Sequence, residues 1–294
     1  MTTALPFPPV VGADLIPFAT FEAFQTFAQN NQGHWAEQVQ QTLRLMALNG
    51  IRDPHDEEVV PPASLQVQGA NFRETFVHQG SLSRHRAVLL ILRNLIRAGL
   101  LPQDLDLRLY CPELLTPFAQ RLQALFPGYV GSEFLPDPED PRRGSLDHQD
   151  ICCLTHADDQ FDLIICNELF EHLYDLPAAL REIKRVLRPD GWLLSTCPIT
   201  YGQRDSIVRA RHRPGAMPGD PAQAELLTEP EFHGDPVNPE NGSLVYQIPG
   251  WDLLDLARQA GLLDGCFIWV NAPAYGILGK EIPAVIVMLA RAPR

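Results

Sequence analysis

The sequence lacks the features that would carry the chain into a membrane or onto nucleic acid. No apolar run approaches the roughly 18 residues that a membrane-spanning helix needs, and the longest candidates, residues 87–92 and 284–290, are each followed by arginine. The N-terminus has neither the basic region nor the apolar stretch of a signal peptide, so we expect a cytoplasmic protein. The formal charge is −13, with no large basic cluster to offset it. Because binding to phosphate requires cationic side chains, we expect neither a nucleic-acid partner nor a membrane partner.

Cysteine is scarce and irregularly spaced. The six cysteines include no CxxC pair, the spacing typical of zinc sites and redox-active dithiols. Four of them stand in or beside apolar runs, which indicates reduced, buried thiols. The histidines and carboxylates of residues 148–156 also lack a compact ligand spacing, so the sequence predicts no metal site.

The pattern of apolar residues changes near residue 100. Residues 1–19 are rich in proline and predicted to be irregular, whereas residues 18–27, 35–47 and 87–100 repeat apolar side chains at helical spacing. The polar, proline-bearing residues 50–70 are typical of a linker or a wrapped loop. We therefore expect residues 1–100 to form an N-terminal helical extension or cap.

Strand-like and helix-like segments alternate after residue 100. The predicted strands are 107–110, 129–134, 161–166, 192–196, 266–270 and 284–291. The predicted helices are 114–126, 176–187 and 250–261, and residues 188–191, Arg-Pro-Asp-Gly, are predicted to form a turn. Repeated β–α units predict an α/β fold with a doubly wound, mostly parallel sheet that binds ligands beyond the carboxyl ends of its strands. Residues 136–147 are predicted to be a loop, and residues 198–249 are long enough to be a functional insertion or lid.

The most specific pattern is residues 161–197, FDLIICNELFEHLYDLPAALREIKRVLRPDGWLLSTC. An FD-apolar strand ends in a polar loop, and a helix of the form ALREIxRVLxPGG and a further strand follow. This block resembles the second half of the class I S-adenosylmethionine-dependent methyltransferase domain, in its type 11-like group, with Asp190 in place of the first turn glycine. The resemblance implies a methyltransferase-type, Rossmann-like sheet with an antiparallel last strand, in a domain that spans residues 101–294.

The resemblance implies S-adenosylmethionine as the cofactor and places its contacts at the strand ends. Glu133 closes the strand YVGSEF, where the family has an acidic residue that binds both ribose hydroxyls. A carboxylate suits this task because it accepts two charge-assisted hydrogen bonds. Asp150 and Ile151 stand where the family's acidic residue and the next backbone N–H contact adenine. Asn167 and Glu168 follow FDLIIC, in the loop that lies against cofactor and substrate in the family.

The first strand departs from the family pattern. The family places a GxGxG loop there, because glycine lets the backbone approach the amino-acid end of the cofactor. Residues 107–118 read LRLYCPELLTPF, without glycine. Either the methionine end of the cofactor contacts Glu113 and Thr116, with Tyr110 as a further candidate, or the pocket has lost the cofactor. A subset of the family shares this glycine-free segment and an upstream Asn-Phe-Arg-Glu stretch, which residues 71–74 match.

Two histidines are candidate general bases, because the pKa of imidazole lies near neutral pH. His233 stands in EPEFHGDP, with Asp235 as its expected orienting partner. His172 follows the polar loop after residue 166. Either ring could take a proton from the acceptor while the sulfonium supplies the methyl group. The alternative interpretation is structural: Asp235 and His233 form a turn, and Glu171 and His172 begin a helix, where a glutamate favours the N-terminal dipole.

These features predict an S-adenosylmethionine-dependent methyltransferase that acts on a small-molecule or glycan-like acceptor. The missing glycine loop supports an alternative, a methyltransferase-like scaffold module that has lost cofactor binding. A nicotinamide oxidoreductase would share the sheet architecture, but its GxGxxG fingerprint is absent.

Overall fold

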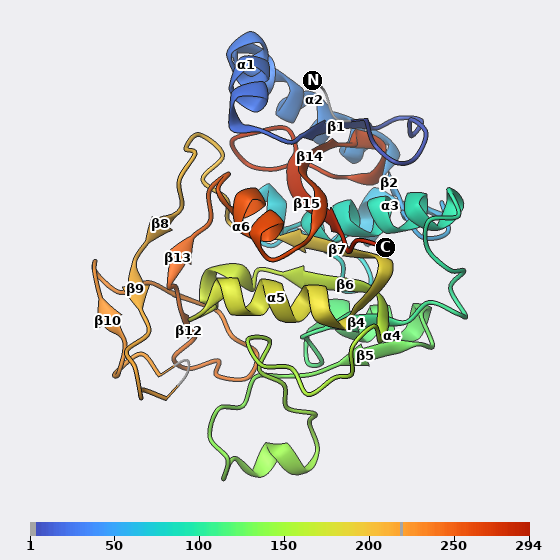
Figure 1. Cartoon of the computed structure of the whole chain (residues 1–294). Helices are drawn as coiled ribbons and strands as arrows, with labels where there is room; N and C mark the ends of the chain where they lie inside the picture. Colours follow the sequence, from blue (N-terminus) through green and yellow to red (C-terminus); the bar gives the residue numbers. More distant parts are fainter. Residues whose placement is uncertain (1–3, 218–219) are drawn as a thin grey trace. The chain divides into compact units, whose positions relative to one another are not determined.

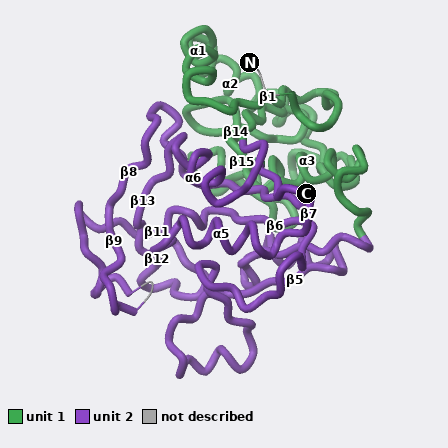
Figure 2. Tube along the Cα trace, in the orientation of Figure 1, with its two compact units in different colours: residues 1–104, 266–289 green, residues 105–265, 290–294 purple. Residues whose placement is uncertain are grey.

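The computed structural model describes residues 4–217 and 220–294 (Figure 1). The chain divides into two compact units (Figure 2). One unit comprises residues 1–104 and 266–289, and the other comprises residues 105–265 and 290–294. The sequence predicted a boundary between residues 100 and 101. Residues 266–289, however, group with the N-terminal residues, whereas the sequence analysis assigned them to the larger domain.

The helices are short relative to the thickness of a membrane. They are α1 (Phe21–Asn31), α2 (Trp35–Asn49), α3 (Ser83–Arg97), α4 (Pro117–Leu125), α5 (Leu176–Val186) and α6 (Leu253–Gln259). Within the described ranges, no helix has both the length and the apolar character needed to cross a membrane.

The principal strands belong to a sheet with the order β1-β14-β15-β7-β6-β4-β5. They are β1 (Asp14–Phe18), β4 (Leu109–Cys111), β5 (Tyr129–Gly131), β6 (Phe161–Asn167), β7 (Leu187–Thr196), β14 (Leu263–Asn271) and β15 (Val285–Arg291). This topology confirms the predicted doubly wound, mostly parallel α/β fold.

The larger unit contains the parallel part of this sheet. Strand β4 pairs in parallel with β5 and with β6, and β6 pairs in parallel with β7. All seven residues of β6 are buried, which explains why its sequence shows no polar alternation. Helix α5 begins at Asp175, whose carboxylate accepts the N–H of Ala178 at 2.9 Å, and buries one apolar face.

Residues 188–191 were expected to form a free turn, but they lie inside β7. The register between β6 and β7 shifts between Phe161 and Leu163, so the strand accommodates a bulge here. Asp190 adopts a φ of +63°, which such a bulge requires and which few residues other than glycine tolerate. The turn-forming composition therefore marks an irregularity within a strand and not the end of one.

Strand β1 corrects the expectation that residues 1–19 are irregular. It pairs antiparallel with β14, and Phe18 stands opposite Phe267. The ring of Phe18 also packs edge-on against Phe24 of α1, with 5.4 Å between centroids. The partner strand is far away along the chain, so the local composition of residues 1–19 could not reveal the pairing.

The upstream Asn-Phe-Arg-Glu stretch forms a single 3-10 turn, η3 (Phe72–Glu74). The Glu74 carboxylate accepts hydrogen bonds from Arg73 at 2.7 Å and from Arg84, in the first turn of α3, at 2.8 Å. Within the N-terminal unit this stretch therefore anchors the start of α3.

The predicted insertion, residues 198–249, folds as short antiparallel pairs and not as helices in its described part. Strand β9 pairs with β10, β11 pairs with β12, and β8 pairs with β13. The short strands of the chain are β2 (Ile51–Arg52), β3 (Val59–Val60), β8 (Ile207–Val208), β9 (Ala210–Arg211), β10 (Glu225–Leu226), β11 (Phe232–His233), β12 (Ser243–Leu244) and β13 (Gln247–Ile248). The single-turn 3-10 helices are η1 (Gln32–His34), η2 (Pro62–Ser64), η3, η4 (Pro141–Gly144), η5 (Phe170–His172) and η6 (Pro273–Tyr275).

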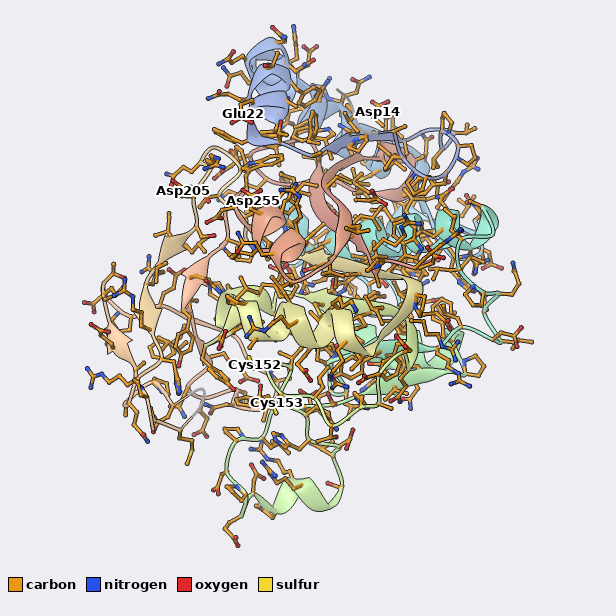
Figure 3. The ribbon with its side chains drawn as sticks, viewed as in Figure 1. Asp14, Glu22, Cys152, Cys153, Asp205 and Asp255 are labelled. Atoms are coloured by element: carbon orange, nitrogen blue, oxygen red, sulfur yellow. The ribbon has the colours of Figure 1, made fainter. Side chains whose placement is uncertain are left out.

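The cysteines are all free thiols, and four of them are buried, as expected. The two others, Cys152 and Cys153, lie side by side in the loop that precedes β6 (Figure 3). The Cys152 thiol donates to the backbone oxygen of Asp175 at 3.4 Å, and burial raises its pKa to about 12. This thiol is therefore protonated at neutral pH and a poor nucleophile.

Candidate functional site

The candidate residues of the larger unit gather where its parallel strands end. Strand β4 lies between β5 and β6, and adjacent strands are about 4.8 Å apart, so the ends of β5 and β6 are separated by roughly 10 Å. Glu113 follows β4, Glu133 follows β5, and Asn167 is the last residue of β6. The structure thus brings these three candidates to the same edge of the sheet.

Glu133 is held in place by the loop after β4. Its Oε1 accepts the backbone N–H groups of Leu114 at 2.8 Å and Leu115 at 2.9 Å, and the side chain is buried. Burial raises the pKa of Glu133, the two amides oppose that rise, and the nearby Asp235 carboxylate adds to it. Its Oε2 accepts no hydrogen bond from the described residues. This oxygen is available to a ligand hydroxyl.

The loop after β4 contains no glycine, but Gly131, the last residue of the neighbouring strand β5, packs directly against that loop. A Cβ on Gly131 would lie 2.6 Å from the backbone oxygen of Glu113 and 2.6 Å from Cδ2 of Leu114. Only glycine at this position lets the loop lie against β5. That close approach brings the amides of residues 114 and 115 to Glu133.

We expect Gly131→Ala to destabilise the protein by about 1–3 kcal/mol, because the added methyl group displaces the loop after β4. Gly144→Ala is the matched control, since a Cβ there meets nothing within 4 Å. Denaturant unfolding of both variants measures the effect. Equal stability of the two variants would show that the loop accommodates the methyl group without cost.

Glu113 and Thr116 are linked to each other at the start of α4. The Thr116 hydroxyl donates to Oε2 of Glu113 at 2.7 Å and accepts the N–H of Ala119 at 3.0 Å, as an N-cap. Burial, and secondarily the charge of Glu113, raises the pKa of the Cys111 and Cys166 thiols. The two thiols are therefore neutral at neutral pH, and the negative charge near the end of β4 is that of the Glu113 carboxylate.

Tyr110 is placed differently from the other candidates. Its side chain is fully buried, its hydroxyl lies 2.8 Å from Oγ of Ser132, and its ring stacks on Phe161 with 5.2 Å between centroids. Phe161 is the first residue of β6, at the opposite end of that strand from Asn167. The structure therefore places Tyr110 in the core and not among the groups at the strand ends.

Asp150 has both carboxylate oxygens occupied by neighbours. Oδ1 accepts the N–H of Cys152 at 2.9 Å, and Oδ2 accepts the Tyr174 hydroxyl at 2.6 Å. The side chain of Ile151 is buried. The predicted strand 129–134 pairs regularly only over Tyr129–Gly131, which is β5. Beyond it, an isolated parallel bridge between Glu133 and His148 brings the segment before Asp150 alongside the end of β5.

Asn167 carries a polar group without a partner. The side chain is 7% exposed, and Oδ1 accepts the Thr196 hydroxyl at 3.2 Å, but Nδ2 is buried with no hydrogen bond. An unsatisfied buried donor costs about 1–3 kcal/mol, so this amide points to a ligand acceptor. Glu168 follows in the left-handed region, with φ +47°, and its N–H bonds the Thr196 carbonyl at 2.8 Å. The strand thus ends in a sharp turn at the site.

A second cluster joins η5 to the insertion. Oε1 of Glu171 lies 3.7 Å from Nε2 of His172 and 3.6 Å from Nδ1 of His233. Glu171 is 0% exposed, and neither of its carboxylate oxygens has a hydrogen-bond partner. Nδ1 of His172 donates to the Leu244 carbonyl at 2.9 Å, and Nε2 of His233 lies 3.3 Å from Oε1 of Glu231. Both candidate bases therefore face one buried carboxylate.

Asp235 does not orient His233, contrary to the sequence expectation. Its carboxylate accepts the N–H of Val237 at 2.8 Å and the hydroxyl of Ser243 at 2.7 Å, and so closes a turn. Glu231 takes the orienting position instead. Residues 231 and 233 point to the same side of the extended segment around β11, whereas the carboxylate of Asp235 is taken up by the turn that follows it.

We expect a pH dependence of stability from His233. Proximity to the Glu171 carboxylate, 3.6 Å away, and next to that of Glu231, raises the pKa of this histidine despite its partial burial. The stabilisation is therefore complete below the usual value of about 6.5 and is lost as pH rises through the raised pKa. In metal-free buffer, the free energy of unfolding of the wild type should fall more than that of His233→Gln between about pH 6 and about pH 8. Parallel pH profiles would contradict this assignment.

The sequence missed the part that Glu171 plays in this cluster. It was interpreted only as a residue of a helix N-terminus, but it lies in the single 3-10 turn η5 and is fully buried. Its partner His233 comes from the insertion, so no local spacing could have signalled the contact. Within the local sequence, only the tripeptide Glu-His-Leu after the polar loop placed a carboxylate beside a candidate base.

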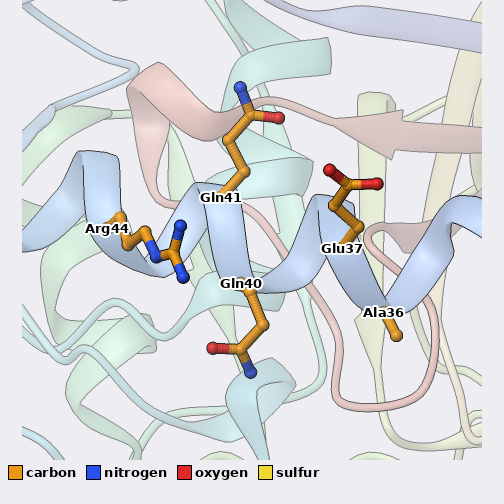
Figure 4. Close-up of a pocket in the computed structure, with 5 residues that line it drawn as sticks. All are labelled: Ala36, Glu37, Gln40, Gln41 and Arg44. Carbon is orange, nitrogen blue, oxygen red and sulfur yellow. The ribbon is translucent and has the colours of Figure 1, made fainter.

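A hollow in the N-terminal unit offers no comparable chemistry. It is lined by Ala36, Glu37, Gln40, Gln41 and Arg44, all on α2 (Figure 4). None of these five residues carries an unsatisfied buried atom or a strained backbone, so the hollow is not part of the site.

Comparison with known proteins finds a match for the segment that contains β6 and Asn167. Residues 137–195 match the family model described as a methyltransferase domain. Methyltransferase GfsG of Streptomyces halstedii is 38% identical over 81 residues, which are 28% of this chain and 27% of that protein. The match confirms the resemblance of this segment to methyltransferases, and the chain spans about a quarter of that relative's length.

Two solved structures are similar to most of the chain at low identity. The [4+2]-cyclase SpnF is 16% identical, with 92% of this chain and 96% of that chain covered and a TM-score of 0.41. An S-adenosylmethionine-dependent methyltransferase from Mesorhizobium loti is 13% identical, with 66% of this chain and 94% of that chain covered and a TM-score of 0.41.

Proposed function

We propose that this chain is an S-adenosylmethionine-dependent methyltransferase whose cofactor lies at the carboxyl ends of β4, β5 and β6. The observation that carries the proposal is the methyltransferase-domain sequence of residues 137–195. That segment supplies β6 and Asn167, and β4 and β5 add Glu113 and Glu133 on the same sheet edge. Ligands of doubly wound sheets bind at this edge.

The residues present fit the cofactor. Oε2 of Glu133 is free to accept a ribose hydroxyl, and the Glu113 carboxylate can pair with the cofactor's ammonium group. The unpartnered Nδ2 of Asn167 can donate to a ligand oxygen. The backbone amides of residues 114 and 115 are bound to Glu133, so side chains must hold the amino-acid end that a glycine loop would otherwise cradle.

When bound, S-adenosylmethionine supplies an electrophilic methyl group, and the residues of the chain position the acceptor in line with it. The insertion packs onto η5: the Tyr246 N–H donates to the Glu171 carbonyl at 2.8 Å, and the Gln247 amide donates to the Phe170 carbonyl at 3.1 Å. These contacts hold the insertion beside His172, and we infer that the insertion selects the acceptor, a small-molecule or glycan-like compound. His172 and His233 are the groups that can take its proton.

We place the chain in the cytoplasm, where its thiols stay reduced.

Calorimetric titration with S-adenosylmethionine and S-adenosylhomocysteine tests the proposal. We expect saturable 1:1 binding in the micromolar range, with reduced nicotinamide dinucleotide as the negative control. An absence of binding at millimolar cofactor would reject the proposal. It would favour a scaffold module, an alternative that draws support from the satisfied amides of residues 114 and 115.

A further inference from the structure

The Glu171 cluster has the composition and spacing of a metal site. Glu171, His172 and His233 each offer one ligand atom, and these atoms all lie within 4.8 Å of one another. Donors about 2.0–2.1 Å from a tetrahedral ion are about 3.3–3.4 Å apart. The N···O distances of 3.7 Å and 3.6 Å to Oε1 of Glu171 therefore need to shorten by only a few tenths of an ångström.

Both imidazoles are oriented for ligation by their second nitrogen. Nδ1 of His172 donates to the Leu244 carbonyl, which leaves Nε2 as the lone-pair nitrogen facing Glu171. Nε2 of His233 is next to the Glu231 carboxylate, which leaves Nδ1 facing the same oxygen. Metal-binding histidines ordinarily pair their non-ligating N–H with a carbonyl or a carboxylate in this way.

The buried carboxylate supplies an independent indication of a ligand. Glu171 is 0% exposed, yet neither oxygen accepts a hydrogen bond. A carboxylate taken out of water without hydrogen bonds is costly, and a cation at this point would satisfy it. The side chains of His172 and His233 are 14% and 33% exposed, so an ion has a route to the carboxylate from the histidine side.

We propose that Glu171, His172 and His233 bind a divalent first-row transition-metal ion, with Zn²⁺ as the reference case. Imidazole ligands favour zinc, copper, iron and nickel over magnesium and calcium, which prefer oxygen donors throughout. Three protein ligands leave at least one coordination position open, as in catalytic metal sites. The sequence analysis predicted no metal site, because it could not place residue 233 beside residues 171 and 172.

The open position gives the ion a role with the acceptor, and this part rests on the proposed function. An acceptor hydroxyl bound to the ion becomes a stronger acid, as metal-bound water does. The two histidines would then be ligands, and the ion would let the acceptor hydroxyl release its proton to solvent water. The oxygen would form its bond to the methyl group as the bond from sulfur to that methyl breaks and S-adenosylhomocysteine leaves. Binding of the metal itself requires no cofactor, so the site can be tested separately.

Protein stripped with a chelator and titrated with Co²⁺ and with Zn²⁺ tests the site. We expect one ion per chain, with Zn²⁺ bound at micromolar or tighter dissociation constants, and weak visible Co²⁺ bands without a thiolate charge-transfer band. His233→Ala should weaken binding at least 100-fold, and Glu231→Gln by about 10- to 100-fold, because Nε2 of His233 then lacks its charged acceptor. His34→Ala, at an exposed histidine of the N-terminal unit, is the matched control and should bind as the wild type does.

Folding is monitored by circular dichroism, and His233 is the preferred site of substitution because it is partly exposed. No stoichiometric binding, equal affinity of His233→Ala and wild type, or a strong cobalt–thiolate band would each overturn the metal site. Metal binding in a protein that does not bind S-adenosylmethionine would preserve this inference and reject the proposed methyltransferase function.

Discussion

Replacing Glu133 with glutamine is expected to weaken S-adenosylmethionine binding by about 10- to 100-fold, which corresponds to the roughly 1.5–3 kcal/mol of a hydrogen bond to a charged group. The amide oxygen of glutamine can still accept the N–H groups of Leu114 and Leu115, so the loop after β4 keeps its position. What the variant loses is the negative charge on Oε2, the oxygen that we propose accepts the ribose hydroxyl.

Calorimetry of the Glu133→Gln variant beside Glu139→Gln measures this effect. Glu139 is exposed in the loop before η4. Its substitution by glutamine removes the same charge at a position away from the strand ends. We expect the control to bind the cofactor as the wild type does. Wild-type affinity in Glu133→Gln would remove Glu133 from the cofactor site, even if the protein binds S-adenosylmethionine.

Replacing Arg86 with methionine is expected to lower the free energy of unfolding by about 3–5 kcal/mol. The guanidinium is 1% exposed, and it donates to the carbonyls of Phe76 and Tyr275 at 2.8 Å, Gly276 at 2.8 Å and Ser81 at 3.0 Å. Methionine fills a similar volume but leaves these backbone oxygens without their donor.

Urea unfolding of Arg86→Met beside Arg44→Met separates the loss of these contacts from the loss of a positive charge. Arg44 is exposed on α2, where the same substitution should change stability by less than about 0.5 kcal/mol. Comparable stability of the two variants would show that the carbonyl cage around Arg86 contributes little.

The elements of the fold that depend on short-range pattern were predictable from the sequence. The continuous apolar run FDLIIC predicted a buried parallel strand, and the apolar face of residues 176–187 predicted helix α5. Strand β1 was not predictable, because its pairing with β14 depends on residues at the other end of the chain. The bulge in β7 was interpreted as a turn because its Pro, Asp and Gly favour both structures.

The candidate site divides in the same way. The family pattern placed Glu133 and Asn167 at the strand ends, and the structure has both on the same edge of the sheet. The role of Gly131 was hidden, because the glycine expected in one loop is found on the adjacent strand. The pairing of His233 with Glu171 and Glu231 was hidden as well, because the insertion folds back onto η5.

The central claim is that Glu133 and Asn167 flank a binding site for the adenosyl sulfonium cofactor. A crystal structure of the protein with S-adenosylhomocysteine tests it most directly. We predict that a ribose hydroxyl lies within hydrogen-bond distance of Oε2 of Glu133 and that Nδ2 of Asn167 donates to the ligand. A ligand bound at another edge of the sheet, with Oε2 of Glu133 and Nδ2 of Asn167 out of its reach, would contradict the claim.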